Sequence, residues 1–158
     1  MKGHPDIIKM LNDVLTAELT SVNQYFLGAK IFLNWGYEYL GKKLYRESIG
    51  EMKHADQIID RVLLLDGLPN LQKLDKVHTG ETVVEQLRLD LANETTHATR
   101  VNDGIKLARD LGDNGTVLVL EAILKSTEEH ADWLESQLEL VKQVGEQNYL
   151  SQQIKPAS

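Results

Sequence analysis

The apolar residues of this chain of 158 residues recur every three or four positions over long stretches, a spacing typical of the buried face of a helix. The first stretch begins near Pro5, whose fixed backbone angle suits the first turn of a helix, and its apolar face covers residues 7–32. After a turn at Asn34-Trp35-Gly36, a second apolar face covers residues 44–65. The segment Asp66-Gly67-Leu68-Pro69 ends this second helix, because proline cannot continue it.

Two further apolar faces, over residues 84–108 and 120–141, predict two more helices of about thirty residues each. Residues 66–80 show no clear periodicity and are numerous enough to run the length of a bundle, so we expect a long crossover connection. A short fifth helix is expected over residues 148–154. The pattern predicts an all-α four-helix bundle with a long crossover and a short C-terminal helix, forming a single domain over residues 1–158.

Composition narrows the chemistry that such a bundle can carry. The chain contains no cysteine, which excludes a disulfide framework, a thiolate zinc site and an iron–sulfur cluster, and leaves oxygen and imidazole ligands. Its formal net charge of −7 argues against binding to nucleic acid and suits the attraction of cations. Since the start of the chain lacks the apolar core of a signal peptide and the aliphatic runs are short, we expect a cytoplasmic protein without a membrane segment.

Each apolar stripe is interrupted near its midpoint by polar residues, namely Glu18, Glu51, Glu94, and the pair Thr127 and His130. A carboxylate removed from water costs several kcal/mol unless it is paired or bound to a metal ion. Three such groups at the centre of one core therefore require compensating positive charge. Divalent cations would supply it.

Two Glu-x-x-His motifs add nitrogen to these oxygens: Glu51 is followed one turn later by His54, and Glu94 by His97. Taken alone, a glutamate on such a face is more often a misphased surface residue, and a histidine is more often a satisfied core side chain. Four helices that place oxygen or nitrogen ligands at compatible depth favour a metal centre instead.

The spacing of Glu18, Glu51-x-x-His54, Glu94 and His130 resembles that of the bacterioferritins. The resemblance covers essentially the whole chain, and supporting segments lie at residues 23–26, 51–56, 66–71 and 148–150. It implies a ferritin-like fold and a hollow shell of 24 subunits, built from twofold dimers, that oxidises ferrous iron at a di-iron centre within each subunit and stores ferric mineral. By the same resemblance, these five residues are the catalytic iron ligands: Glu18 and His54 hold one iron, Glu94 and His130 hold the other, and Glu51 bridges them.

The same family binds haem b between two subunits through a methionine, which matches Met52. Met52 lies about 100° around its helix from Glu51, on a flank that the core within the chain does not need. The other apolar residues of this flank are Tyr45, Ile49, Ile59 and Leu63. Without the resemblance, the ordinary interpretation of Met52 is a gap-filling methionine at an interface. With it, we expect the sulfur to ligate haem iron, which an electron-donor protein such as a ferredoxin would reduce.

The fourth helix departs from the family pattern, because the expected Glu-x-x-His is Thr127-Glu128-Glu129-His130. A neutral hydroxyl is a poor ligand for iron, so we expect weaker metal occupancy and reduced ferroxidase activity. The helical period turns Glu128 and Glu129 away from the position of residue 127. His97 is either an additional nitrogen that leans toward the damaged site or an ordinary histidine on the helix flank. Tyr25 is either an electron donor or a packed core tyrosine.

Four functions remain to be distinguished. Iron storage with ferrous oxidation and bound haem b is the first. The second is a haem-bearing accessory subunit of a mixed shell, with an impaired ferroxidase site, that assembles with a second bacterioferritin subunit. An oxygen-activating di-iron hydroxylase would need a substrate cavity and a docking site for a reductase, and the chain shows no additional domain for them. A DNA-protecting miniature ferritin is disfavoured by the net charge and by ligands that lie within one bundle.

Overall fold

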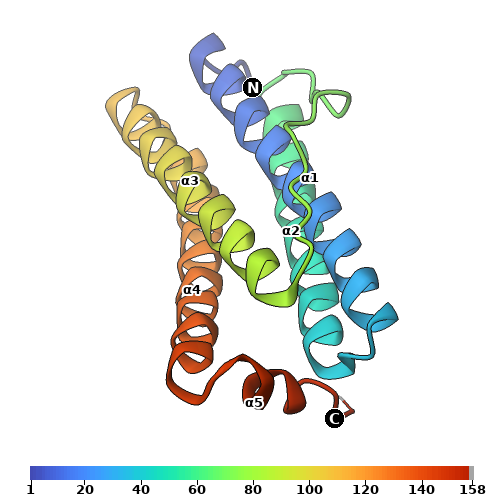
Figure 1. Ribbon diagram of the computed structural model, residues 1–158. Helices are drawn as coiled ribbons and strands as arrows, with labels where there is room; N and C mark the ends of the chain where they lie inside the picture. The colour runs from blue at the N-terminus through green and yellow to red at the C-terminus, as the bar shows by residue number, and fades with distance from the viewer. Residues whose placement is uncertain (157–158) are drawn as a thin grey trace.

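The computed structural model describes residues 1–156, in which every regular element is a helix and no strand occurs (Figure 1). The helices are α1 (Pro5–Asn34), α2 (Glu38–Leu64), α3 (Val83–Asp110), α4 (Asn114–Val144) and α5 (Glu146–Ser151). Helix α1 packs mainly against α2, and α3 packs mainly against α4, so two antiparallel pairs form the bundle. The expected all-α bundle with a short fifth helix is confirmed. Over residues 1–156, no helix is both long and apolar enough to cross a membrane.

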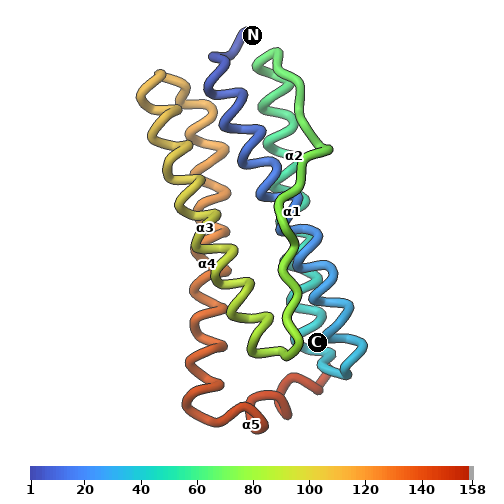
Figure 2. The backbone as a smooth tube through the Cα atoms, turned by 45° about the horizontal axis from the view of Figure 1, so that its top comes forward, coloured from blue at the N-terminus to red at the C-terminus, as the bar shows by residue number. Residues whose placement is uncertain are grey.

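The long crossover runs beside α1 and carries the chain from one end of the bundle to the other (Figure 2). The backbone amide of Asp75 donates to the hydroxyl of Thr20 over 2.9 Å. The amide of His78 donates to the side-chain oxygen of Gln24, one turn further along α1, over 3.1 Å. These bonds satisfy backbone groups that a connection without secondary structure would otherwise leave unpaired.

The fifth helix begins earlier than the sequence indicates, at Glu146 instead of residue 148, and it ends at Ser151 instead of residue 154. The reason is Gly145, whose φ of 88° lies in the left-handed region that glycine adopts without steric cost. That single residue ends α4 and turns the chain. The backbone amide of Tyr149 then bonds to the carbonyl of Gly145 over 3.0 Å, so α5 starts at once.

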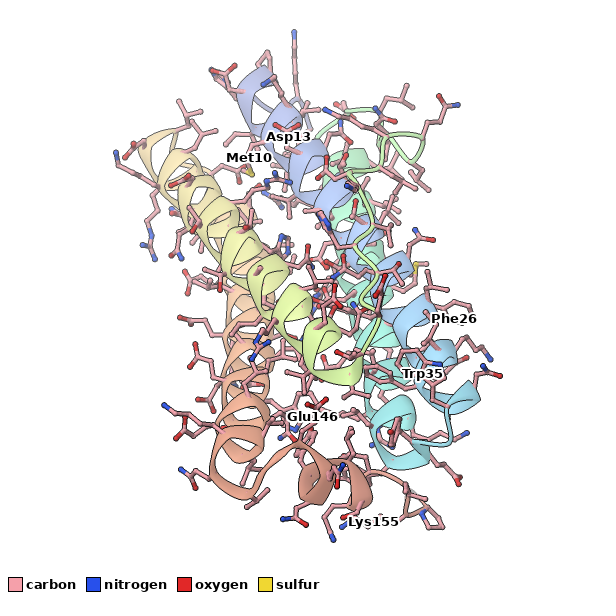
Figure 3. All side chains as sticks on the ribbon, in the orientation of Figure 1. Met10, Asp13, Phe26, Trp35, Glu146 and Lys155 are labelled. Atoms are coloured by element: carbon pink, nitrogen blue, oxygen red, sulfur yellow. The ribbon has the colours of Figure 1, made fainter. Side chains whose placement is uncertain are left out.

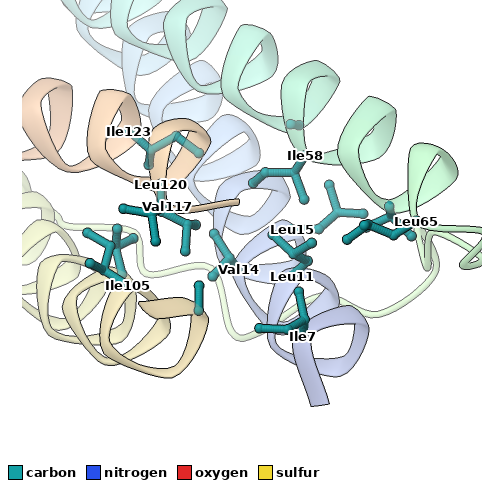
Figure 4. Close-up of a cluster of buried hydrophobic side chains, with 14 residues drawn as sticks. Ile7, Leu11, Val14, Leu15, Ile58, Leu65, Ile105, Val117, Leu120 and Ile123 are labelled. Carbon is teal, nitrogen blue, oxygen red and sulfur yellow. The ribbon is translucent and has the colours of Figure 1, made fainter. Parts of the chain in front are cut away.

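Two apolar clusters fill the two ends of the bundle and leave its middle to polar side chains. The first is shown in Figure 4 and consists of Ile7, Leu11, Val14, Leu15, Ala55, Ile58, Val62, Leu65, Val101, Ile105, Ala108, Val117, Leu120 and Ile123. The second consists of Tyr25, Ala29, Phe32, Leu40, Leu44, Val83, Leu87, Leu134 and Tyr149. Burial of each large apolar side chain contributes roughly 1.5–3 kcal/mol, so the two clusters stabilise the helices on both sides of the polar middle.

Candidate metal centre

The five residues predicted as iron ligands lie between the two apolar clusters and come from all four long helices. They are Glu18 on α1, Glu51 and His54 on α2, Glu94 on α3 and His130 on α4. All are buried except His54, which keeps a small exposed fraction. The helical register thus places oxygen and nitrogen ligands at one depth of the bundle.

One group of three ligands joins α1 to α2. The Nδ1 atom of His54 lies 3.2 Å from Oε2 of Glu51 and 3.5 Å from Oε2 of Glu18. One ligand atom from each of these residues lies within 4.8 Å of the other two. Two carboxylates and one imidazole at that separation form a set of hard and borderline donors that suits iron.

A second group contains a residue that the sequence did not reveal. The Nδ1 atom of His130 lies 3.0 Å from Oε1 of Glu94 and 3.7 Å from Oε2 of Glu47. Ligand atoms of Glu47, Glu51 and His130 lie within 4.8 Å of one another. The available signal was the position of Glu47 four residues before Glu51, which puts both on one face of α2. Glu51 belongs to both groups, which is the placement that a bridging carboxylate needs.

Thr127 is buried on α4 beside His130 and is already hydrogen-bonded. Its hydroxyl donates to the backbone carbonyl of Ile123 over 2.9 Å, a common bond for a threonine within a helix. Glu128 and Glu129 are exposed, as the helical period predicted. The lack of a carboxylate at position 127 is therefore not corrected by its neighbours on α4.

The interpretation of His97 as an ordinary flank histidine is wrong. His97 is buried, and its Nε2 atom lies 2.5 Å from Oε1 of Glu18. Within residues 1–156 it forms no hydrogen bond or ion pair with Glu94 or His130, toward which the sequence suggested that it could lean. Helix α3 turns its side chain toward α1 instead, so His97 fixes the carboxylate of Glu18.

Tyr25 is a packed core tyrosine that also contacts the centre. Its hydroxyl donates a short hydrogen bond to Oε1 of Glu94 and accepts one from the side-chain amide of Asn93 over 3.0 Å. Its ring stands edge-on to that of His130, with 5.1 Å between the centroids. Burial and the nearby charge of Glu94 raise the pKa of Tyr25 well above its usual value, so the phenol stays protonated as a donor.

The two carboxyl groups nearest His54 have opposite pKa shifts. Burial and the charge of Glu18 raise the pKa of Glu51 well above its usual range. Burial alone would raise the pKa of Glu18 as well, but its interactions with Glu51, His54 and His97 outweigh burial and hold that pKa well below its usual range. In the metal-free protein Glu18 is therefore the anion, and Glu51 carries a proton toward it.

Both buried histidines of the centre favour their charged forms. Burial alone would lower the pKa of His97, but its bond to Glu18 outweighs burial and raises it. The pKa of His130 is raised for the same reason by Glu94. The carboxylates thus favour proton uptake by both imidazoles when no metal ion is bound. Because a metal ion binds only the neutral imidazole, we expect it to displace these protons.

Several buried polar atoms in the centre have no hydrogen-bond partner within residues 1–156. They are Oε2 of Glu18, Oε2 of Glu94, Nδ1 of His97 and Nε2 of His130. A buried polar atom without a partner costs about 1–3 kcal/mol, and more if it is charged. Cations held by the carboxylate oxygens would remove part of this cost, so the residues present fit iron.

Near the centre, Asp90 of α3 is fully buried without belonging to either ligand group. The side-chain amides of Gln24 and Gln86 each donate to its Oδ1 atom over 2.8 Å. The side-chain oxygens of Gln24 and Gln86 in turn accept hydrogen bonds from backbone amides of the crossover. At Gly80 the crossover comes so close to α3 that a Cβ atom there would lie 2.7 Å from the backbone nitrogen of Gln86. Asp90 therefore holds the end of the crossover in place.

We expect Asp90→Asn to stabilise the protein near neutral pH. Burial raises the pKa of Asp90 from 3.8 to about 6, so stability falls as the pH rises between these values and the cost persists above them. The variant removes that cost, which is up to about 3 kcal/mol at neutral pH and close to zero at about pH 4. Urea unfolding of the metal-free protein at both pH values measures it, with the exposed Asp56→Asn as control. An equal gain in unfolding free energy at both pH values would show that the gain does not come from removing the buried charge of Asp90.

Met52 lies on an exposed apolar face of the chain, with 48% of its surface exposed. The exposed apolar residues on the same flank of α2 are Tyr45, Ile49 and Leu63. Phe26 of α1 extends this face, with its ring centroid 5.9 Å from that of Tyr45, and lies on the side of the bundle remote from α3 (Figure 3). Ile59 differs from expectation, because it packs partly against the first apolar cluster. We call Phe26, Tyr45, Ile49, Met52 and Leu63 the Met52 face.

A ferritin-like domain model matches residues 8–144 of the chain, which extend from the first turn of α1 to the end of α4. The fold and the centre of carboxylates and histidines thus define a ferritin-like protein. Curated relatives narrow the class further. The chain is 45% identical over 152 residues to a bacterioferritin of Mycobacterium leprae, which covers 96% of each protein.

Two other relatives agree with this match. The chain is 46% identical over 151 residues to a bacterioferritin of Streptomyces coelicolor, covering 96% of this chain and 90% of that protein. It is 40% identical over 149 residues to a bacterioferritin of Brucella melitensis, covering 94% of this chain and 92% of that protein. The chain belongs to the bacterioferritin family, a family of iron-storage proteins, and the resemblance found in the sequence is confirmed.

Proposed function

We propose that this protein stores iron by oxidising ferrous ions with dioxygen at the centre between its four long helices and holding the ferric product as mineral inside a cytoplasmic shell of 24 subunits. The observation that carries the proposal is the burial of Glu18, Glu51 and Glu94 in one core. Their partners in the structure are imidazoles and a phenol. Such a set lacks a fixed cation of the kind that a structural ion pair would use, and it can exchange protons for metal ions.

In this proposal residues 1–158 form one ferritin-like domain whose ligands have distinct roles. Glu18 and His54 hold one ferrous ion, Glu94 and His130 hold the other, and Glu51 contacts both. The two ferrous ions would together give two electrons to dioxygen, which takes up two protons and leaves as hydrogen peroxide, and the carboxylates would stabilise the higher charge of the ferric product. His97 positions Glu18 through its 2.5 Å contact, and Tyr25 positions Glu94.

The test adds ferrous iron and dioxygen to the metal-free protein and follows ferric absorbance and the iron content of the assembled shell. We expect oxidation to continue without any organic substrate and to end in mineral, which would also exclude a hydroxylase. Glu18→Gln removes a terminal ligand and should slow the initial rate about 10- to 100-fold, the range known for lost metal-site partners. A variant as fast as the native chain would contradict the proposal.

The Met52 face supports a second part of the function. A soft thioether on an exposed apolar face suits a haem iron shared with a second copy of the chain, and we propose haem b there. When bound, haem supplies one-electron transfer. An electron-donor protein such as a ferredoxin would deliver that electron and reduce stored iron for release.

A second candidate function follows from Thr127. With one carboxylate missing from α4, the chain could serve as the haem-bearing accessory subunit of a mixed shell, beside an oxidation-competent bacterioferritin subunit. Ferrous oxidation by the pure homopolymer, compared with that of a mixed shell, separates the two functions. A homopolymer that oxidises iron as fast per subunit as the mixed shell is not an accessory subunit.

A further inference from the structure

The ligands assigned to the proposed centre leave it one negative charge short of two divalent ions. Glu18, Glu51 and Glu94 bring three carboxylates to two divalent ions, and the hydroxyl of Thr127 is bonded to its own helix. A fourth carboxylate would balance the ions. His97, the first alternative that the sequence offers, cannot replace it, because it is bound to Glu18 in the other half of the centre.

Glu47 is the carboxylate that the structure places beside the uncompensated half. It lies on α2, one turn before Glu51, and its Oε2 atom is 3.7 Å from Nδ1 of His130. Ligand atoms of Glu47, Glu51 and His130 lie within 4.8 Å of one another, as do those of Glu18, Glu51 and His54. Residue 47 thus approaches His130 from α2, whereas residue 127 would approach along α4.

Lys43 fixes the orientation of Glu47. Its ammonium group donates to Oε1 of Glu47 over 2.8 Å, which leaves Oε2 to face His130. The same ammonium nitrogen lies 4.9 Å from the ring centroid of Trp133, whose ring stacks on His130 at 6.1 Å. Both side chains of the Lys43–Glu47 pair are largely covered, with 28% and 19% of their surfaces exposed, so Glu47 does not point freely into solvent.

An independent observation points to a cation in this half of the centre. Glu94 is fully buried, and its Oε2 atom has no hydrogen-bond partner within the described part of the chain. Its other oxygen accepts from Tyr25 and faces His130. A buried carboxylate oxygen without a donor is costly, and a cation at this position would satisfy it.

We propose that Glu47 supplies the fourth carboxylate, so that Glu47, Glu51, Glu94 and His130 form the second iron position of this chain. The inference rests on the proposed function, because it presupposes metal binding at the centre. It assigns to α2 the ligand that α4 lacks. The position of the second ion then depends on Lys43, which holds Glu47 in place.

The test titrates the metal-free, assembled protein with cobalt(II) under anaerobic conditions and counts bound ions by visible absorbance and by metal analysis after gel filtration. We expect two cobalt ions per subunit for the native chain and one for Glu47→Gln. The affinity for the second ion should fall at least about 10- to 100-fold, because loss of an outer-shell partner alone costs that much. Exposed Glu128→Gln, the same chemical change on α4, is the control and should keep both ions.

Adding Thr127→Glu to the Glu47→Gln variant separates a ligand from a merely structural residue. If Glu47 is a ligand, the new carboxylate on α4 should restore the second ion. Two ions bound with native affinity in Glu47→Gln would overturn the proposal, and so would a native chain that binds only one. A native chain that binds no cobalt at the centre contradicts the proposed function itself. In contrast, a native chain that binds a single ion, which is lost in Glu18→Gln but kept in Glu47→Gln, contradicts the Glu47 assignment alone.

Discussion

Replacing Glu51 by glutamine should abolish iron oxidation and remove both metal ions from the centre. Glu51 belongs to both ligand groups, so its loss affects the ion near His54 and the ion near His130 together. Loss of a single metal-site partner costs about 10- to 100-fold in affinity or activity, and we expect the initial rate of ferrous oxidation to fall by at least about 100-fold. Stopped-flow absorbance after mixing with ferrous iron and dioxygen measures this rate.

The same variant should be more stable than the native chain when both are free of metal. Burial and the charge of Glu18 raise the pKa of Glu51, so the folded protein retains a proton that the unfolded chain loses. Stability therefore falls as the pH rises above the ordinary carboxyl range, and the cost is absent well below that range. Glutamine has no such cost. The melting temperature should rise more at neutral pH than at about pH 4.

Glu18→Gln is the matched control, since Glu18 is also a buried carboxylate but belongs to one ligand group only. Its pKa is shifted downward, so Glu18 stabilises the folded state and its loss should lower the melting temperature of the metal-free protein. We expect it to lose one ion and keep the other. Equal loss of ions in the two variants would remove the bridging role from Glu51.

Much of this architecture could be predicted from sequence periodicity, because a buried helical face repeats every 3.6 residues and proline and glycine mark its ends. The ends of the first four helices follow such signals. The predicted ends of the fifth helix were wrong by two to three residues, because the start of this helix depends on the positive φ of Gly145, which composition alone does not reveal. Periodicity also gave the depth of Glu18, Glu51 and Glu94, since each interrupts an apolar stripe near its middle.

The direction of a side chain at the edge of a stripe could not be predicted in the same way. His97 and Glu47 both lie one turn from a ligand, and whether such residues face solvent or the core depends on how neighbouring helices are rotated. The structure turns His97 onto Glu18 and Glu47 toward His130. At position 127 the sequence shows that a carboxylate is missing. It does not show that a carboxylate on another helix lies close enough to replace it.

Met52→Leu should yield an assembled shell without haem. Leucine nearly preserves the apolar volume of methionine, and Met52 is exposed on its own chain, so folding should be unaffected. Only the thioether sulfur is lost, and leucine offers iron no ligand. After expression with added haem and purification by gel filtration, we expect the haem absorbance to fall to background while the elution volume stays native. Met10→Leu, on α1 outside the Met52 face, is the control and should keep haem.

Met52→His distinguishes an axial ligand from a residue that merely lines the pocket. An imidazole can replace the thioether as a ligand, so this variant should keep haem and lower its reduction potential, because thioether ligation raises the potential relative to imidazole. A lining role predicts the opposite ranking: leucine would retain haem with an unchanged spectrum, and the polar histidine would weaken its binding. Haem retained in Met52→Leu with native absorbance and potential would therefore contradict the assignment, and the ligand would have to be sought elsewhere on the Met52 face.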